Sequence, residues 1–237
     1  MLRALRTLPL LLMLAIAGAA RADTVDMLLF ENPGLFDVSP QGEVGGPGAR
    51  LLQRVSTVSG VGLRLQVMPI ARILLTLEQQ PGTCAAGLAR TPEREAALRW
   101  AGPVSSSAMV LYGRLDEKRS VQGLEDLRGA VIAAQRQSVP VAWLRDHGLQ
   151  VQEARDAPTA LRMLQAQRVD YWLVNDLLAQ HTFRGLGSTP ARPLHTFGRI
   201  DGYLVCHRDT PAATMARFQG ALDQLRRDGE LAPFGLR

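Results

Sequence analysis

Short apolar segments alternate with amphipathic segments along most of the chain, and this alternation is what most restricts the fold. Apolar runs and period-two patterns predict strands at 25–30, 63–67, 83–88, 108–113, 130–134, 169–174 and 202–206. Apolar residues at helical spacing predict helices at 49–59, 70–79 and 138–147, after Asp156 and after Thr210, with loops at 31–48 and 183–201. Strands that alternate with helices favour mostly parallel sheets flanked by helices, so we expect an α/β fold.

The first 22 residues have the layout of a secretory signal peptide. Arg3 and Arg6 come before an apolar run at 8–16, and Ala20 and Ala22 form a small-x-small end before the mature chain. The apolar run is too short for a stable membrane anchor, which needs about 20 residues. We therefore expect cleavage after Ala22 and a free, exported protein, with an uncleaved anchor as the alternative.

The net charge of the mature chain limits the classes of partner that we expect. Removal of residues 1–22 takes away three of the 27 basic residues and none of the 22 acidic ones, so the net charge of +5 falls to about +2. Residues 23–237 suffice for one large domain or for two smaller lobes. No stripe of lysine and arginine with interleaved aromatic residues is present, so nucleic acid is not an expected partner.

Cys84 and Cys206 are the only two cysteines. In an oxidising compartment an even number of cysteines favours a disulfide, and two separate buried thiols are the alternative. A redox pair or a metal site is not expected. The chain has no Cys-x-x-Cys motif, and its four histidines are scattered without metal-ligand spacing.

The segment 87–95 reads GLARTPERE and follows the predicted strand 83–88. In open α/β sheets, ligands bind at the carboxyl ends of the strands. Thr91 is placed to cap a following helix, with Pro92 at its first position. Arg94 would then project beside the free N–H groups of the helix start and could hold a carboxylate through two hydrogen bonds. A capped surface helix with a solvated Arg94 is the alternative.

The stretch 68–104, which contains RTPERE and WAGP, resembles the type II periplasmic solute-binding proteins of the family 3, amino-acid-binding group. It is most similar to a branch with the motifs P-W-A-R-A-L, R-T-P-E-R-E and W-x-G-P. The resemblance implies two α/β lobes, joined by two crossover strands, that close on a small ligand. Lobe 1 would comprise 23–112 and 203–237 and lobe 2 would comprise 113–202. Both cysteines would then lie in lobe 1.

The resemblance also implies which residues would bind the ligand. Arg94 matches the arginine that holds the ligand carboxylate, and Ser138 matches a helix-start hydroxyl of lobe 2 that completes the clamp. Asn175 stands where these proteins commonly place an aspartate for the α-amino group. The full expected set is Arg94, Thr91 and the backbone at Ala89, then Ser138 and Asn175, and finally Phe36 and Ile70, which lie near positions that often carry aromatic rings over the ligand.

Several positions depart from the family pattern. Ile70 replaces a tryptophan, and Asn175 replaces an acid. Gly87 and Ala89 replace hydroxyl residues, and Arg90 adds a charge at the mouth of the site. A clamp for an anion is kept, while recognition of an ammonium group is weakened. An amino acid and another small anionic metabolite therefore remain alternative ligands.

The function that the resemblance implies is capture of a small polar, carboxylate-bearing solute in the periplasm by hinge closure, without catalysis and without a cofactor. The closed form would dock on an inner-membrane permease of an ABC-type uptake system or on a sensor, and the protein itself would be a monomer. One alternative is a sensor or interaction module with a degenerate amino-acid site. Another is a dehydratase for prephenate-like acids, which would need a general acid facing the cleft.

Overall fold

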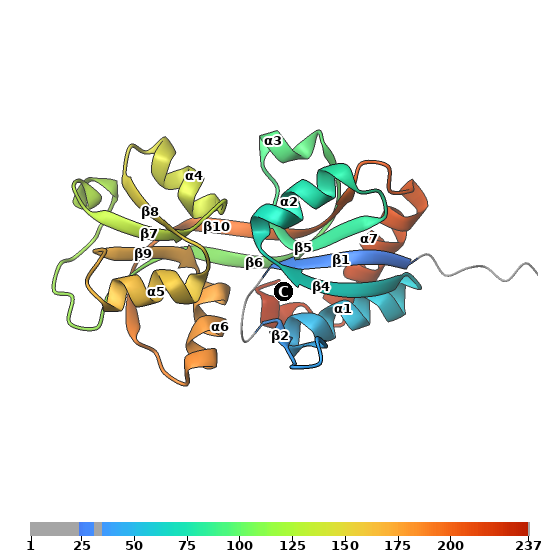
Figure 1. Ribbon diagram of the computed structural model, residues 1–237, viewed down its shortest axis with the longest axis horizontal. Coiled ribbons are helices and arrows are strands. Elements are labelled where there is room, and N and C mark those ends of the chain that lie inside the picture. Colours follow the sequence, from blue (N-terminus) through green and yellow to red (C-terminus); the bar gives the residue numbers. More distant parts are fainter. Residues whose placement is uncertain (1–23, 31–34, 237) are drawn as a thin grey trace, which may run out of the picture.

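A computed structural model describes residues 24–30 and 35–236 of the chain. The predicted signal peptide, residues 1–22, lies outside this described part. Figure 1 shows two lobes side by side, joined by the long strands β6 (Leu98–Arg114) and β10 (Ala191–His207), each of 17 residues. The expected α/β fold of two lobes joined by two crossover strands is therefore confirmed.

One eight-stranded sheet runs through both lobes in the order β4-β1-β5-β10-β6-β9-β7-β8. The remaining strands of this sheet are β4 (Gly62–Met68), β1 (Thr24–Phe30), β5 (Thr83–Ala89), β9 (Tyr171–Asn175), β7 (Val131–Gln135) and β8 (Gln150–Ala154). Strand β1 pairs in parallel with β4 and β5, and β7 pairs in parallel with β8 and β9. The crossover strand β10 is antiparallel to both β5 and β6, so the chain returns to lobe 1 beside the strand that left it.

Helices cover both faces of the sheet in lobe 1 (Figure 1). Helices α1 (Gly46–Ser59) and α7 (Ala212–Arg227) lie on one face, and α2 (Ile70–Gln79) lies on the other. Met27 and Leu29 of β1 belong to the core under α1 and α7, whereas Leu28 belongs to the core under α2. This is the alternation that a strand buried on both faces requires. Three short elements complete the lobe: β2 (Asp37–Val38), β3 (Val44–Gly45) and α3 (Pro92–Glu95).

Lobe 2 repeats this three-layer arrangement. Helices α5 (Ala157–Gln165) and α6 (Asp176–Leu186) pack on one face of its strands, and α4 (Val139–Asp146) packs on the other, with the 3₁₀ turn η1 (Leu124–Leu127) beside it. Asp156 caps α5 as the sequence predicts, because its carboxylate accepts a 2.7 Å hydrogen bond from the backbone N–H of Thr159. Each lobe therefore has its own core.

The structure differs from the sequence-based expectation mainly at the crossover strands. The strands expected at 108–113 and 202–206 are only the lobe-buried ends of β6 and β10, and the expected loop 183–201 contains the end of α6 and most of β10. The middle parts of both strands are polar, so no apolar pattern marks them. Helix α6 was not predicted because it buries His181 and Thr182 together with apolar residues. The edge strand β8 was also missed.

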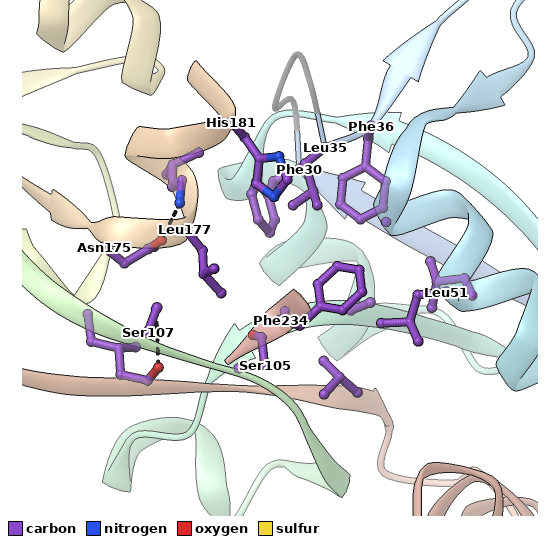
Figure 2. A pocket seen from close by; sticks show the side chains of 18 of the residues that line it. Phe30, Leu35, Phe36, Leu51, Ser105, Ser107, Asn175, Leu177, His181 and Phe234 are labelled. Carbon is purple, nitrogen blue, oxygen red and sulfur yellow. Dashed lines mark hydrogen bonds between the residues drawn. The ribbon is translucent and has the colours of Figure 1, made fainter. Parts of the chain in front are cut away.

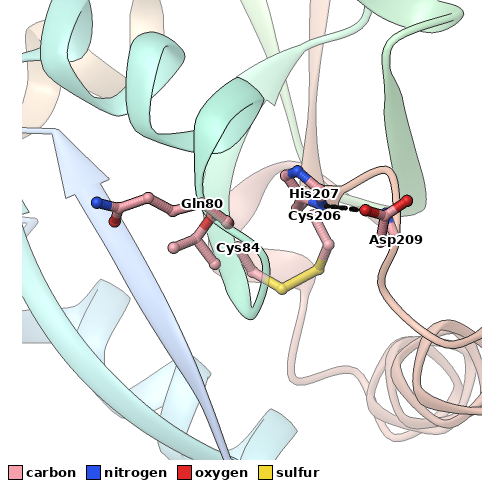
Figure 3. Close-up of a disulfide and its surroundings, with 6 residues drawn as sticks. Gln80, Cys84, Cys206, His207 and Asp209 are labelled. Carbon is pink, nitrogen blue, oxygen red and sulfur yellow. Dashed lines mark hydrogen bonds and ion pairs between the residues drawn. A yellow bond between two sulfur atoms is a disulfide. The ribbon is translucent and has the colours of Figure 1, made fainter.

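The two cysteines form a disulfide, as the sequence predicts, so the alternative of separate thiols is wrong. Cys84 of β5 and Cys206 of β10 are paired in register across the antiparallel ladder and are fully buried (Figure 3). The bond ties β5, which leads into GLARTPERE, to the crossover strand β10.

Within the described residues, no cluster of His, Cys, Asp and Glu side chains could hold a metal ion. None of the described helices has the length and apolar content needed to cross a membrane.

Candidate functional site

Two adjoining cavities lie between the lobes, where the carboxyl ends of β1, β5, β7 and β9 meet. The Arg94 cavity measures about 80 Å³, and its lining includes Ile70, Ala89, Arg94, Gln137, Ser138 and Val139. The Phe36 cavity measures about 90 Å³, and its lining includes Phe36, Leu51, Val55, Leu177, His181 and Phe234 (Figure 2). Both cavities are also lined by Phe30, Gly87, Asn175, Leu178 and Ile200. The two cavities therefore share a wall.

Arg94 reaches from lobe 1 across the cleft to lobe 2. Its Nη1 donates to the carbonyl oxygen of Ala89 and its Nη2 donates to the carbonyl oxygen of Gln137, both at 3.3 Å. These bonds are long for N–H···O contacts and engage only two of the five guanidinium donors. In the described part of the chain, no carboxylate lies within ion-pair distance of Arg94. Burial lowers the pKa of the guanidinium, although an arginine stays protonated at neutral pH. The cleft thus contains a partly buried cation that forms no ion pair with any described residue, although the charge of Glu93 acts on it from a distance.

Arg90, four residues earlier, has a different environment. Its Nη2 lies 2.7 Å from Oε1 of Glu95, and its guanidinium lies over the rings of Trp100 and Tyr203 at 5.7 and 6.0 Å from their centroids. It lines neither of the two cavities, but it lines a neighbouring pocket that shares Ala89, Val139 and Ile200 with the Arg94 cavity, so its paired charge lies beside that cavity. The charges of the GLARTPERE segment therefore separate into a compensated surface pair and one arginine directed into the cleft.

Ser138 and Gln137 form the opposite wall of the Arg94 cavity. Ser138 occupies the N-cap position of α4, as predicted, but its hydroxyl does not cap the helix. Its Oγ is buried and has no hydrogen-bond partner among the described residues. Gln137 adopts a left-handed conformation with φ of 58°, at the turn where its carbonyl oxygen accepts from Arg94. A guanidinium, a free hydroxyl and a helix N-terminus therefore converge, which is a favourable arrangement for an anion.

The polar side chains at the start of α6 are engaged in holding the helix. Oδ1 of Asn175 accepts a 2.7 Å hydrogen bond from the backbone N–H of Leu178 and so caps α6 (Figure 2). Oδ1 of Asp176 accepts from the backbone N–H groups of Ala108 and Leu177 at 2.9 and 2.8 Å. Among the described residues that line the two cavities there is no aspartate or glutamate. The described part of the lining therefore offers a cation and no acid.

Several solved structures have the same architecture. A histidine kinase sensor domain with similarity to periplasmic binding proteins matches with a TM-score of 0.80 and 21% identity, over 90% of this chain and 95% of that domain. An ancestral arginine-binding protein bound to arginine matches with a TM-score of 0.75 and 18% identity, over 89% and 96%. The GluR0 ligand-binding core from Nostoc punctiforme in complex with L-glutamate matches with a TM-score of 0.75 and 17% identity, over 89% and 96%. This chain has the fold of type II periplasmic binding proteins. No family model matches the sequence, and no curated protein matches it.

In this periplasmic-binding-protein fold, the predicted site residues divide between the two cavities. Four of them line the Arg94 cavity, Phe36 lines the Phe36 cavity and Asn175 lines both; the four are Ile70, Ala89, Arg94 and Ser138. Thr91 lines neither. It occupies the N-cap position of the single-turn helix α3, but its hydroxyl does not cap that helix. It hydrogen-bonds the Glu93 carboxylate instead and thereby lowers the pKa of Glu93.

Sequence analysis missed much of the Phe36 cavity. Phe30 ends a correctly predicted strand, so the rule that ligands lie at the carboxyl ends of strands could have found it. Leu177 and His181 belong to the unpredicted helix α6, and Ile200 lies in a segment that was expected to be a loop. Phe234 belongs to the C-terminal 3₁₀ turn Ala232–Phe234, which no sequence pattern linked to this site.

Proposed function

We propose that this protein binds a small carboxylate-bearing solute in the cleft between its lobes, without catalysing a reaction. The observation that carries the proposal is Arg94, a partly buried cation that shares its cavity with the Ser138 hydroxyl of the other lobe; among the described residues, Arg94 makes no ion pair and the hydroxyl has no hydrogen-bond partner. A carboxylate between these groups would replace two long bonds to carbonyl oxygens by shorter, charge-assisted hydrogen bonds. Arg94 is thus the clamp, with Ser138 completing it from lobe 2.

The proposed mechanism is hinge closure. The clamp groups belong to different lobes, so a ligand that touches both favours the closed arrangement over an open one. The lobes would divide as the sequence indicates, with 23–112 and 203–237 on one side and 113–202 on the other. The hinge would then fall within the polar middle of β6 and β10, where Ser107 Oγ donates to the carbonyl oxygen of Ile200 at 3.3 Å.

The biological setting follows from the fold and the predicted signal peptide. We place the protein in the periplasm as a binding protein of the amino-acid-binding group, RTPERE branch, that delivers its ligand to an ABC-type permease. The arginine-bound and glutamate-bound relatives in fold support a ligand that carries a carboxylate. The similarity to a histidine kinase sensor domain favours a second candidate, in which the closed form signals to a sensor instead. The clamp is the same in both.

A thermal-shift screen of the purified protein tests the clamp. The ligands are amino acids, polyamines, small organic acids and sugars. At about 100-fold excess over Kd, a bound ligand raises the free energy of unfolding by roughly 2.7 kcal/mol. We expect carboxylates to stabilise the wild type and the Arg94→Ala variant to lose this shift. The matched control Arg90→Ala should keep it. An undiminished shift in Arg94→Ala, or stabilisation by sugars or polyamines alone, would overturn the proposal.

A further inference from the structure

The Phe36 cavity points to the chemical class of the ligand. We propose that the ligand is an amphipathic carboxylate without an α-ammonium group, with its carboxylate on Arg94 and an aromatic or branched aliphatic group in the Phe36 cavity. This inference rests on the proposed function of the Arg94 clamp and adds the part of the ligand that the clamp does not touch. Three features of the cleft carry it: the adjacency of the two cavities, the mostly apolar lining of the second, and the lack of acids among the described residues that line either of them.

The two cavities adjoin at residues that line both. Phe30, at the end of β1, lines both cavities, and so do Leu178 at the start of α6 and Ile200 of β10. A ligand held at Arg94 would therefore extend past these apolar side chains toward the Phe36 cavity. The wall itself is ordered by aromatic packing, since the rings of Phe30 and Phe36 meet edge to face with centroids 6.1 Å apart.

The second cavity suits an apolar group. Phe36, Leu51 and Phe234 face it from lobe 1, and Leu177 faces it from lobe 2 (Figure 2). Two of its polar oxygens are already occupied: Ser107 Oγ donates to the carbonyl of Ile200, and Asn175 Oδ1 accepts from the backbone of Leu178. Ser105 and His181 are the other polar side chains of the described lining, and neither carries a formal negative charge. A charged side chain placed here would lose its hydration against a mostly apolar lining, whereas an apolar group would be transferred from water favourably.

The lack of acids argues against an α-ammonium group. None of the described lining residues is an aspartate or glutamate, and the carboxylate of Asp176 is engaged by two backbone N–H groups. The position predicted to hold an α-amino group carries Asn175, whose oxygen is used to cap α6. Among the described residues, an ammonium group next to the carboxylate would therefore find no free anionic partner, and it would lie near the cation Arg94.

Four probe compounds isolate these features in calorimetric titrations of the wild-type protein. The probes are 3-phenylpropanoate, L-phenylalanine, 3-phenylpropan-1-ol and acetate. L-Phenylalanine adds only the ammonium group, the alcohol removes the carboxylate, and acetate removes the apolar body. We expect 3-phenylpropanoate to bind most tightly, on the order of 10–100-fold better than acetate because the ring is buried. We expect L-phenylalanine to bind at least roughly tenfold more weakly than 3-phenylpropanoate.

Two leucines of α6 provide a matched pair of variants. Leu177 lines the Phe36 cavity, whereas Leu186 is 51% exposed and lines neither cavity. Leu177→Ala should weaken 3-phenylpropanoate severalfold and leave acetate unchanged, and Leu186→Ala should change neither. Arg94→Ala should weaken both carboxylates.

The outcomes separate this inference from the proposed function. If acetate and 3-phenylpropanoate bind equally well and both depend on Arg94, the carboxylate clamp stands and the apolar subsite is overturned. If L-phenylalanine equals or exceeds 3-phenylpropanoate, the exclusion of an ammonium group is overturned while the clamp again stands. If no carboxylate binds, or if Arg94→Ala changes nothing, both the proposed function and this inference fail.

Discussion

The Arg94 cavity and the Phe36 cavity share five lining residues and have similar volumes of about 80 and 90 Å³, yet only the first is lined by a charged side chain, Arg94. The first presents a guanidinium, a free hydroxyl and the start of α4. The second presents rings and aliphatic side chains, together with Ser107 and Asn175, whose side-chain oxygens are hydrogen-bonded to the backbone. This difference indicates that a bound ligand is oriented by a gradient of polarity along the cleft, rather than by paired charges at both of its ends.

Removal of the disulfide tests whether both cavities depend on the same pair of strands, β5 and β10. We expect it to have the largest effect on stability and binding. Cys84 lies just before Ala86 and Gly87, and Cys206 follows Gly202. These three neighbours of the cysteines line the Phe36 cavity, and Gly87 also lines the Arg94 cavity. Loss of a native disulfide typically costs about 2–5 kcal/mol. We expect the double variant Cys84→Ala, Cys206→Ala to lose this amount in urea unfolding and to bind acetate and 3-phenylpropanoate more weakly by similar factors.

A reductant provides the control for the disulfide prediction. It should lower the stability of the wild type but not that of the double variant, which has no bond to reduce. A variant as stable as the wild type would mean that the bond does not stabilise the pairing of β5 with β10. Weaker binding of 3-phenylpropanoate with unchanged acetate affinity would mean that the bond supports the Phe36 cavity alone.

Acid should lower the free energy of unfolding through Glu117, which lines neither cavity. The Glu117 side chain in lobe 2 is 5% exposed, and hydrogen bonds from Arg119 lower the pKa of its carboxyl from 4.5 to about 2. The folded protein therefore holds fewer protons on Glu117 than the unfolded chain does between these pH values. Its contribution to stability is complete above the unfolded pKa and is lost as the pH falls toward 2.

The size of this acid effect is limited by solvent. The full shift corresponds to roughly 3 kcal/mol. The Arg119 side chain is 51% exposed, so screening should reduce the effect to about 2 kcal/mol. Glu117→Gln should lose this amount at neutral pH and should show a shallower decline between pH 4.5 and 2, measured by urea unfolding. Equal slopes in the two proteins would exclude Glu117 as the responsible group.

The two cavities also differ in how far the sequence predicts them. The Arg94 cavity is made largely by short contiguous segments, so GLARTPERE and the helix start at Ser138 could be recognised from residue order alone. Two details there depend on tertiary geometry and were not predicted: the bond from Arg94 to the carbonyl of Gln137, and a Ser138 hydroxyl that does not cap its helix. Capping preference is a tendency of residue types and does not determine where one hydroxyl points.

The Phe36 cavity depends on sheet order, which hydrophobic periodicity does not encode. Its wall brings Phe36 of the N-terminal region beside Leu177 of α6 and Phe234 of the C-terminal turn. These segments meet because β10 returns between β5 and β6. The middle of β10 is polar, so no apolar pattern predicted this returning strand. The alternation of strands and helices did predict the α/β fold itself.

The shared wall predicts a variant that disturbs both cavities together. Gly87 lines both, has a φ of +82°, and a Cβ there would lie 3.2 Å from the ring of Phe30, which also lines both. A left-handed alanine costs about 1–2 kcal/mol. We expect Gly87→Ala to lose this stability and to weaken acetate and 3-phenylpropanoate alike.

Gly60 is the matched control for Gly87. It has a φ of +68° and no atom within 4 Å of an added Cβ, so Gly60→Ala should cost similar stability without changing either affinity. If both alanine variants bind like the wild type, the wall between the cavities tolerates an added methyl group and the two cavities are not coupled through Gly87.

The smallest effect should be confined to the Arg94 cavity. The Ser138 hydroxyl is buried without a partner among the described residues, so Ser138→Ala removes no hydrogen bond and should leave the free energy of unfolding unchanged or slightly higher. A carboxylate would gain a hydrogen bond from this hydroxyl, so both carboxylate probes should bind roughly tenfold more weakly to the variant.

Ser107 of the Phe36 cavity is the opposite case, because its hydroxyl already donates to the carbonyl oxygen of Ile200 at 3.3 Å. Ser107→Ala should therefore lower stability by about 1 kcal/mol and leave acetate affinity unchanged, as measured by urea unfolding and calorimetry. If Ser138→Ala is destabilised and binds acetate as the wild type does, its hydroxyl is a structural group, and the polarity gradient of the cleft then rests on Arg94 alone.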